Sequence, residues 1–220
     1  MNFAVRIPLA ADPAQLQQLR SLQEEFTKAC NSIAPTVVSH RCWNRVTLHH
    51  LTYKQLRDQF PRLGSQMACN AIYAVCRAAR IVYQHPKSPF NLAALGDRSL
   101  PRMQFAGNSP VYFDRHTLSL RENQVSIFTL DGRIKLGVTI DPEVTRRFRQ
   151  ERVREIVLNS KAGEFGLSFV FDDQAAPAPL ERSPATRLLD ESIPEHVQVQ
   201  LQSESKLPHT GGHHTTFTQA

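Results

Sequence analysis

Alternating apolar and polar residues mark a β-hairpin near the middle of the chain, within residues 111–138. The dipeptide Asp131-Gly132 separates the last two alternating runs, and it is a strong signal for a type I′ turn, in which both central residues have positive φ. Such a turn predicts that Leu130 pairs with Arg133 and that Phe128 pairs with Lys135. One face of the hairpin is then apolar, and it consists of Val125, Ile127, Ile134, Leu136 and Val138.

The opposite face of this hairpin is polar and cationic, and it carries Ser126, Phe128, Arg133 and Lys135. Cationic side chains on a sheet can contact a sugar-phosphate backbone. The outward face of an antiparallel sheet is also commonly just solvated. The hairpin pattern leaves both interpretations open.

Apolar residues at helical spacing predict three helices before the hairpin. The first follows Asp12-Pro13, an N-cap carboxylate with a proline in the first turn. The second is expected to use Thr52 as its N-cap and to break at Pro61. The third is expected over residues 64–83. Its apolar stripe is expected to pack in the core. The opposite stripe could contact nucleic acid or be merely solvated, and it consists of Gln66, Asn70, Tyr73, Arg77 and Arg80.

The order of the elements predicts an α+β fold. A strand is expected at residues 3–9 and another at 112–120, and a second hairpin follows over 155–160 and 164–171. Phe165, Leu167, Phe169 and Phe171 alternate toward one face of that hairpin, which is expected to be core. We therefore expect a small β-barrel with a helical subdomain inserted after its first strand. The expected divisions are the first barrel strand at 1–10, the helical insert at 11–100, the remaining strands at 101–173, and a disordered C-terminal tail at 174–220.

Composition excludes several classes of protein. The sequence has no apolar run close to the roughly 20 residues that span a bilayer and no signal-peptide pattern, so we expect no membrane association and a cytoplasmic location. The four cysteines lack Cys-x-x-Cys spacing, which disfavours a zinc ribbon or a disulfide framework. No phosphate loop or nucleophile motif occurs. We expect no catalytic residue, no metal site and no cofactor.

The charge is concentrated in the part of the chain that is expected to fold. Residues 1–173 hold 23 Lys and Arg against 15 Asp and Glu, a net charge of +8, whereas residues 174–220 hold 3 against 5, a net charge of −2. Most of the cations are arginines, which favour bidentate contacts with phosphate. Nucleic acid is therefore the first partner to consider.

An ordered series of stretches resembles the N-terminal half of TnpB-type proteins, the RNA-guided nucleases of bacterial insertion sequences, which are related to the type V CRISPR effectors. The series is FAVRIPLAADPAQLQQLRSLQEEFTKACNSI, LTYKQLRDQFPRLGSQMACNAIYAVCRAAR, PVYFDRHTLSLRENQVSIFTLDGRIKLGV and NSKAGEFGLSFVFD, within residues 3–173. The resemblance implies a wedge-like set of strands and a recognition-like helical insert. Together these would hold a guide-type RNA and read a short motif in double-stranded DNA beside the target.

The resemblance also implies particular nucleic-acid-binding residues. Tyr53, Gln66 and Asn70 resemble positions that face target-adjacent DNA. Phosphate contacts to RNA or to the heteroduplex would come from Arg77, Arg80, Arg133 and Lys135, and Arg57 belongs to the same expected binding set.

The sequence departs from this family where the nuclease domain should begin. A Gly-x-Asp-x-Gly-like metal aspartate and a Cys-x-x-Cys ribbon are missing, and Asp172-Asp173 is interpreted as a polar strand end. We therefore expect a truncated, nuclease-deficient, transposase-like protein that binds nucleic acid without cutting it. One alternative is a non-functional remnant of a decayed insertion sequence. The other is an accessory subunit whose apolar face, at residues 165–171, docks a nuclease domain supplied in trans.

Overall fold

The computed structural model describes residues 3–96, 98–121, 123–151, 153–161, 163–171 and 192–201. Asp172, Asp173 and most of the predicted disordered tail lie outside this part of the chain. The fold is mixed α+β, as predicted. The helices are α1 (Pro13–His40), α2 (Arg45–Gln59), the 3-10 helix η1 (Pro61–Leu63), α3 (Ser65–Gln84), α4 (Leu92–Leu95) and α5 (Pro142–Gln150).

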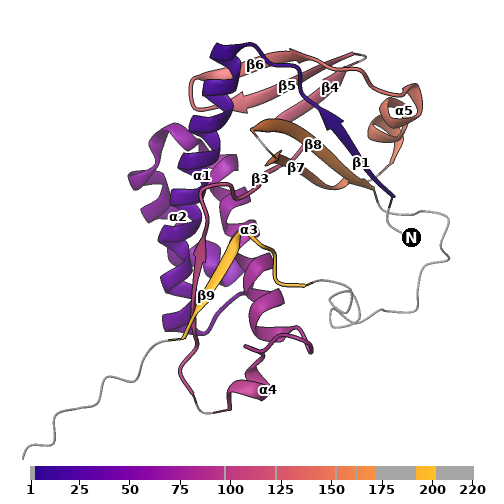
Figure 1. Cartoon of the computed structure of the whole chain (residues 1–220). Helices are drawn as coiled ribbons and strands as arrows, with labels where there is room; N and C mark the ends of the chain where they lie inside the picture. The colour runs from indigo at the N-terminus through magenta and orange to yellow at the C-terminus, as the bar shows by residue number, and fades with distance from the viewer. Residues whose placement is uncertain are drawn as a thin grey trace, which may run out of the picture.

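The strands form three sheets within the described residues. Their order is β1-β8-β7-β3 in the first sheet, β4-β5-β6 in the second and β2-β9 in the third. The strands are β1 (Phe3–Pro8), β2 (Arg102–Phe105), β3 (Val111–Phe113), β4 (Leu118–Arg121), β5 (Gln124–Thr129), β6 (Gly132–Gly137), β7 (Val153–Lys161), β8 (Glu164–Phe171) and β9 (Val197–Gln200). Figure 1 shows α1, α2 and α3 grouped together, with the two larger sheets at one end of this group and α5 beside them.

The pairing of the first strand confirms that the helices are an excursion from the sheet. β1 pairs antiparallel with β8, from Phe3 opposite Phe171 to Pro8 opposite Gly166, although the three long helices separate β1 from the other strands. The expected barrel is not found, because no strand pairing among the described residues joins the four-stranded sheet to the three-stranded sheet.

The helix boundaries follow local capping. Asp12 caps α1 in a capping box with Gln15, as the sequence predicted. The prediction that Thr52 caps the second helix is wrong. Asn44 caps α2 by accepting from the amides of Val46 and Thr47, and Thr52 lies inside the helix, where its hydroxyl donates to the Leu48 carbonyl. The break at Pro61 is confirmed.

The predicted strand over 112–120 is interrupted by a turn. Asp114 ends the first half, and its Oδ1 accepts hydrogen bonds from the amides of His116 and Thr117 at 3.0 Å each. Such local side-chain bonding offers the backbone an alternative to the sheet ladder. The segment therefore supplies β3 to one sheet and β4 to the other.

The hairpin register differs from the prediction by two residues. Phe128 pairs with Arg133, and Thr129 pairs with Gly132. Leu130 and Asp131 form the turn, and positive φ occurs at Gly132 but not at Asp131, so the turn is not type I′. A two-residue shift keeps every side chain on its face, and the predicted apolar face is confirmed: Val125 and Ile127 are fully buried.

The buried core is continuous, and it includes side chains of α1, α2 and α3 as well as those of the strands and α5. Phe165, Leu167, Phe169 and Phe171 are at most 3% exposed, and Phe169 meets Phe148 of α5 edge to face. The alternative in which this face is open and docks a nuclease domain in trans is therefore wrong for this face. The prediction of a core face is confirmed.

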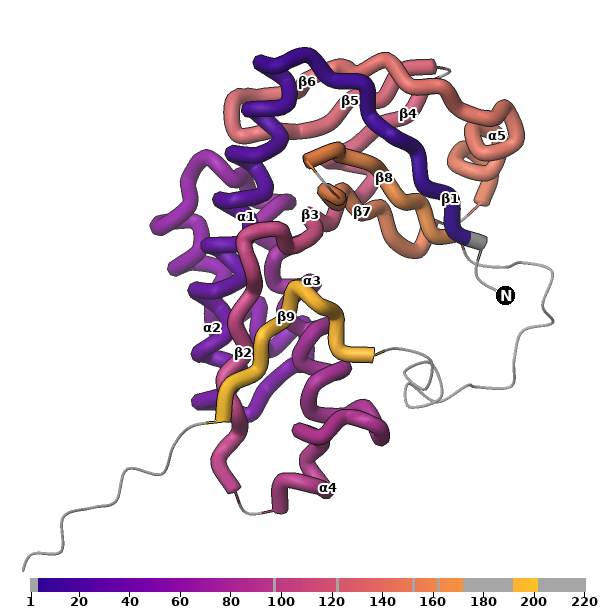
Figure 2. The backbone as a smooth tube through the Cα atoms, viewed as in Figure 1, coloured from indigo at the N-terminus to yellow at the C-terminus, as the bar shows by residue number. Residues whose placement is uncertain are grey.

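One part of the predicted disordered tail is a strand. Residues 192–201 are described, and β9 pairs antiparallel with β2, from Arg102 opposite Gln200 to Phe105 opposite Val197. Figure 2 shows β9 running beside β2 next to the helices. The alternating residues of VQVQ explain the pairing, because Val197 is buried against the helical part.

Candidate nucleic-acid interface

The polar stripe of α3 faces the protein and not the solvent along most of its length. Asn70 is 6% exposed, and its Nδ2 donates to the Tyr112 carbonyl at 3.1 Å. The side chain of Gln66 donates to Asp114. Both were predicted to face target-adjacent DNA. Their hydrogen bonds hold α3 against β3, so they are structural contacts.

Arg77 and Tyr73 of the same stripe meet a buried carboxylate. Glu155 Oε1 of β7 accepts from the Tyr73 hydroxyl at 2.6 Å and from Arg77 Nε at 3.0 Å. The Glu155 side chain is 9% exposed. Burial, and then the adjacent Glu155 charge, raise the pKa of the Tyr73 hydroxyl. Arg77 is therefore committed to this network, and of the predicted cations on α3 Arg80 alone is exposed.

Tyr53 and Arg57, the two residues of α2 that were predicted to bind nucleic acid, lie on one side of that helix. The ring of Tyr53 stacks on His49 with centroids 4.5 Å apart, and His50 contacts His49 edge on. Arg57 follows one turn later and is partly buried. Its Nη1 is a buried nitrogen that has no hydrogen-bond partner among the described residues. This side of α2 therefore combines stacked rings with a cation.

The outer face of the β4-β5-β6 sheet is the clearest cationic surface. Arg133 and Lys135 are exposed on β6, as predicted, and Arg121 is exposed on β4. The β-ladder places Ser119 opposite Ser126 and Ser126 opposite Lys135, with Arg121 two residues further along β4. Adjacent strands are about 4.8 Å apart and each residue advances about 3.4 Å along a strand, so Arg121 lies diagonally across the sheet, roughly 12 Å from Lys135 and roughly 17 Å from Arg133 between backbone positions. We call Arg121, Arg133 and Lys135 the cationic sheet face.

The guanidinium of Arg133 is oriented by carbonyl groups. Its Nη1 donates to the Ser126 carbonyl at 3.2 Å, and its Nη2 donates to the His116 carbonyl at 2.6 Å. Among the described residues, the side chains of Arg121 and Lys135 have neither an ion pair nor a hydrogen bond. The nearby Asp131 is bound to Arg62 at 2.5 Å. The cationic sheet face therefore keeps its positive charge.

Two residues on this face differ from the prediction. Phe128 is not a free aromatic ring, because its Cζ would lie 3.2 Å from a Cβ placed on Gly64, which shows that the ring packs against that glycine. Arg121 was missed. The alternation in Leu118-Ser119-Leu120-Arg121, with both leucines buried, is the signal that could have found it.

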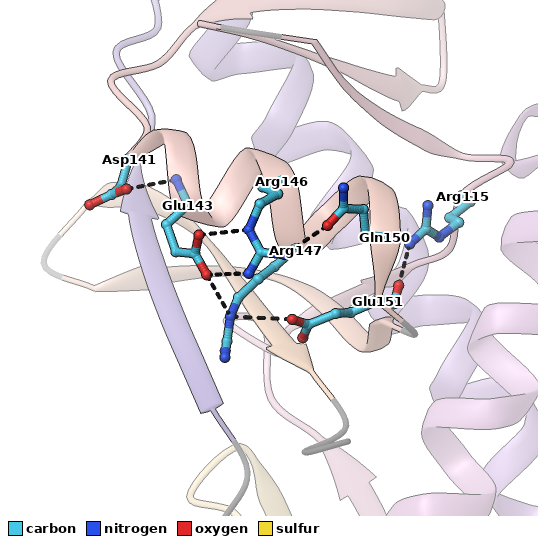
Figure 3. Close-up of polar contacts among 7 residues, drawn as sticks. All are labelled: Arg115, Asp141, Glu143, Arg146, Arg147, Gln150 and Glu151. Atoms are coloured by element: carbon cyan, nitrogen blue, oxygen red, sulfur yellow. Dashed lines mark hydrogen bonds and ion pairs between the residues drawn. The ribbon is translucent and has the colours of Figure 1, made fainter. Parts of the chain in front are cut away.

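Arg146 and Arg147 of α5 are paired with carboxylates, unlike the cations of the cationic sheet face. Figure 3 shows Arg146 and Arg147 turned toward Glu143, with Arg147 also near Glu151. The hydrogen bond from Arg146, and its charge, lower the pKa of the Glu143 carboxyl. Arg115 covers the Phe148 ring at 4.7 Å and donates to the Glu151 carbonyl at 2.9 Å. These contacts cap and brace α5.

The segment with β9 covers a small hollow between the helices and β3. His196 lies in it with its ring 6.5 Å from that of Phe105, and the hollow is also lined by Cys30, Arg77 and Tyr112. Burial, followed by the nearby Arg77 charge, lowers the pKa of His196 from 6.5 to about 4. The neutral imidazole is therefore the form that docks.

Acidification is expected to release this segment. The His196 pKa is lowered when docked, so His196 favours docking above pH 6.5, and this contribution is lost as pH falls from 6.5 toward 4. Because the ring is partly exposed, we expect docking to weaken by roughly three- to tenfold at pH 5.5. Hydrogen exchange of the β9 amides, corrected for intrinsic rates, would measure this change. His196→Gln should remove the pH dependence, and a His196 ring that titrates near its ordinary pKa in the docked state would contradict it.

No protein-family model matches the chain, and no curated protein matches it. No helix in the described part of the chain is both long enough and apolar enough to cross a membrane. Within the same residues, no group of three or more His, Cys, Asp or Glu could hold a metal ion.

Proposed function

We propose that this protein binds structured RNA through the cationic sheet face, as a TnpB-like protein that lacks the family's nuclease motifs. The observation that carries the proposal is a sheet with one largely buried apolar face and an opposite face that carries exposed cations. The charges of Arg121, Arg133 and Lys135 are not neutralised by carboxylates in the described residues. Cations in this arrangement suit a sugar-phosphate backbone, which is recognised by charge and shape.

The sequence resemblance supports the same partner. A wedge-like sheet that is interrupted by helices after its first strand is what the resemblance implies, and such a platform would hold a guide-type RNA. Recognition of target-adjacent DNA is the second part of the proposal. Tyr53 and Arg57 are the residues of the predicted set that best fit it, because Gln66 and Asn70 are bonded within the protein.

The test is a charge-matched comparison. Replacing Arg121, Arg133 and Lys135 together with alanine is expected to weaken binding of a stem-loop RNA by about tenfold at low salt, since each exposed ionic contact contributes on the order of 0.5 kcal/mol. The slope of log K against log salt should fall by about 2, because three phosphate contacts are lost. Filter binding at several salt concentrations measures both quantities.

The control variant removes the same charge elsewhere. Lys28, Lys87 and Arg102 are exposed on α1, the loop after α3 and β2. Their combined replacement with alanine should leave most of the RNA affinity intact. Equal losses in the two triple variants, with equal thermal stability, would show that the binding follows net charge and not the cationic sheet face.

A further inference from the structure

Arg6 crosses the four-stranded sheet on the side away from the core. In the β-ladder, Arg6 of β1 lies opposite Ser168 of β8, and Pro8 lies opposite Gly166. Gly166 in turn lies opposite Asn159 of β7. The Arg6 side chain passes over Gly166, and its Nε donates to Asn159 Oδ1 at 3.4 Å. Arg6 thus spans three strands while remaining exposed.

Gly166 makes this path possible. A Cβ at residue 166 would lie 2.9 Å from Arg6 Nε, 3.1 Å from Nη2 and 3.2 Å from Cζ. Real Cβ atoms essentially never lie within 3.0 Å of another atom, so the 2.9 Å approach to Nε means that a side chain at residue 166 would displace the guanidinium. Glycine inside a strand often marks such a close approach. The Arg6 side chain therefore packs directly on the β8 backbone at Gly166.

Most N–H donors of the Arg6 guanidinium have no acceptor among the described residues. Among the described residues, Arg6 donates only to Asn159, and it has no carboxylate partner. Asn159 Nδ2 donates to Ser168 Oγ at 3.4 Å, so the Ser168 hydroxyl can donate outward. The carboxylate of Glu155, also on β7, is bound by Arg77 and Tyr73. A positioned guanidinium and a hydroxyl donor together suit a phosphate group.

We infer that Arg6, seated on Gly166 and held by Asn159, forms a second phosphate contact for the same RNA, with Ser168 as an additional donor. This inference rests on the proposed function, because the ligand is the RNA that the cationic sheet face would bind. It assigns a separate sheet and separate residues to that ligand.

A double-mutant cycle tests the inference. Arg6→Ala is expected to weaken binding of a stem-loop RNA by about threefold. Gly166→Ala keeps every charge but displaces Arg6, and it should cause a similar loss. The double variant should bind no more weakly than either single variant, because Gly166 acts through Arg6. Independent, additive losses, or an Arg6→Ala variant with unchanged affinity, would overturn the inference.

Two further measurements keep the outcome decisive. If Gly166→Ala is unstable on thermal melting, Asn159→Ala takes its place in the cycle, since it removes the group that holds Arg6. Lys87→Ala is the control for loss of one exposed charge. The triple variant of the cationic sheet face separates the two proposals. If the triple variant loses RNA affinity and Arg6→Ala does not, only the Arg6 site is rejected. If neither variant loses RNA affinity, both the Arg6 site and the proposed function are rejected.

Discussion

Replacing Glu155 with alanine is expected to lower the free energy of unfolding by about 3 kcal/mol, because it removes the acceptor that the partly buried side chains of Arg77 and Tyr73 share. Glu155 Oε1 receives both hydrogen bonds, and its side chain is 9% exposed. Tyr73 also packs edge to face on Tyr112, 5.6 Å away. Chemical denaturation monitored by circular dichroism measures the change.

Two control variants separate charge from position. Glu155→Gln keeps an oxygen acceptor but loses the charge, so it should cost less than Glu155→Ala. Glu164 is exposed at the start of the adjacent strand β8, and Glu164→Ala should change stability by no more than about 0.5 kcal/mol. If Glu155→Ala were as mild as Glu164→Ala, the Glu155 network would not be what holds α3 to the sheet.

This network also explains why the sequence misplaced part of the candidate site. A stripe of Gln66, Asn70, Tyr73 and Arg77 opposite an apolar stripe is typical of a solvated or ligand-binding helix face. Its partners come from β3 and β7, which lie far along the chain: Glu155 is 78 residues after Arg77. Spacing along one helix cannot show that a distant strand presents a carboxylate to it.

The hairpin shows the opposite case, in which a wrong detail left the main conclusion intact. The turn was placed on Asp131-Gly132, whereas Leu130 and Asp131 form it. The slip is an even number of residues, and side chains alternate with a period of two, so the same residues face the core and the same cations face outward. Arg133 and Lys135 were found for that reason.

The packing of Arg6 on Gly166 could not have been predicted from the residue pattern along a single strand. Gly166 interrupts an otherwise alternating strand, and this signal is consistent with a bulge as well as with a close approach. Whether Gly166 marks a bulge or a close approach depends on the register of β1 against β8. That register brings residues 6 and 166 close together, although they are far apart in the sequence. The order of helices and strands could be predicted, because the spacing of apolar residues within each element indicates its type. The pairing of strands that lie far apart in the sequence could not be predicted in this way.

Replacing Phe169 with alanine is expected to cost about 3–5 kcal/mol of unfolding free energy, the range for removing a fully buried aromatic side chain. Phe169 is 0% exposed in the middle of β8, and it meets Phe148 of α5 at 5.7 Å between ring centroids. Its loss leaves a cavity between the four-stranded sheet and α5 that neighbouring side chains fill only in part. Val170, the next residue, is only partly buried on the outer face of the sheet, so Val170→Ala should cost far less. Urea denaturation of both variants measures the difference. A Phe169→Ala variant as stable as Val170→Ala would mean that this face is not core, and it would restore the alternative in which residues 165–171 dock a separate nuclease domain.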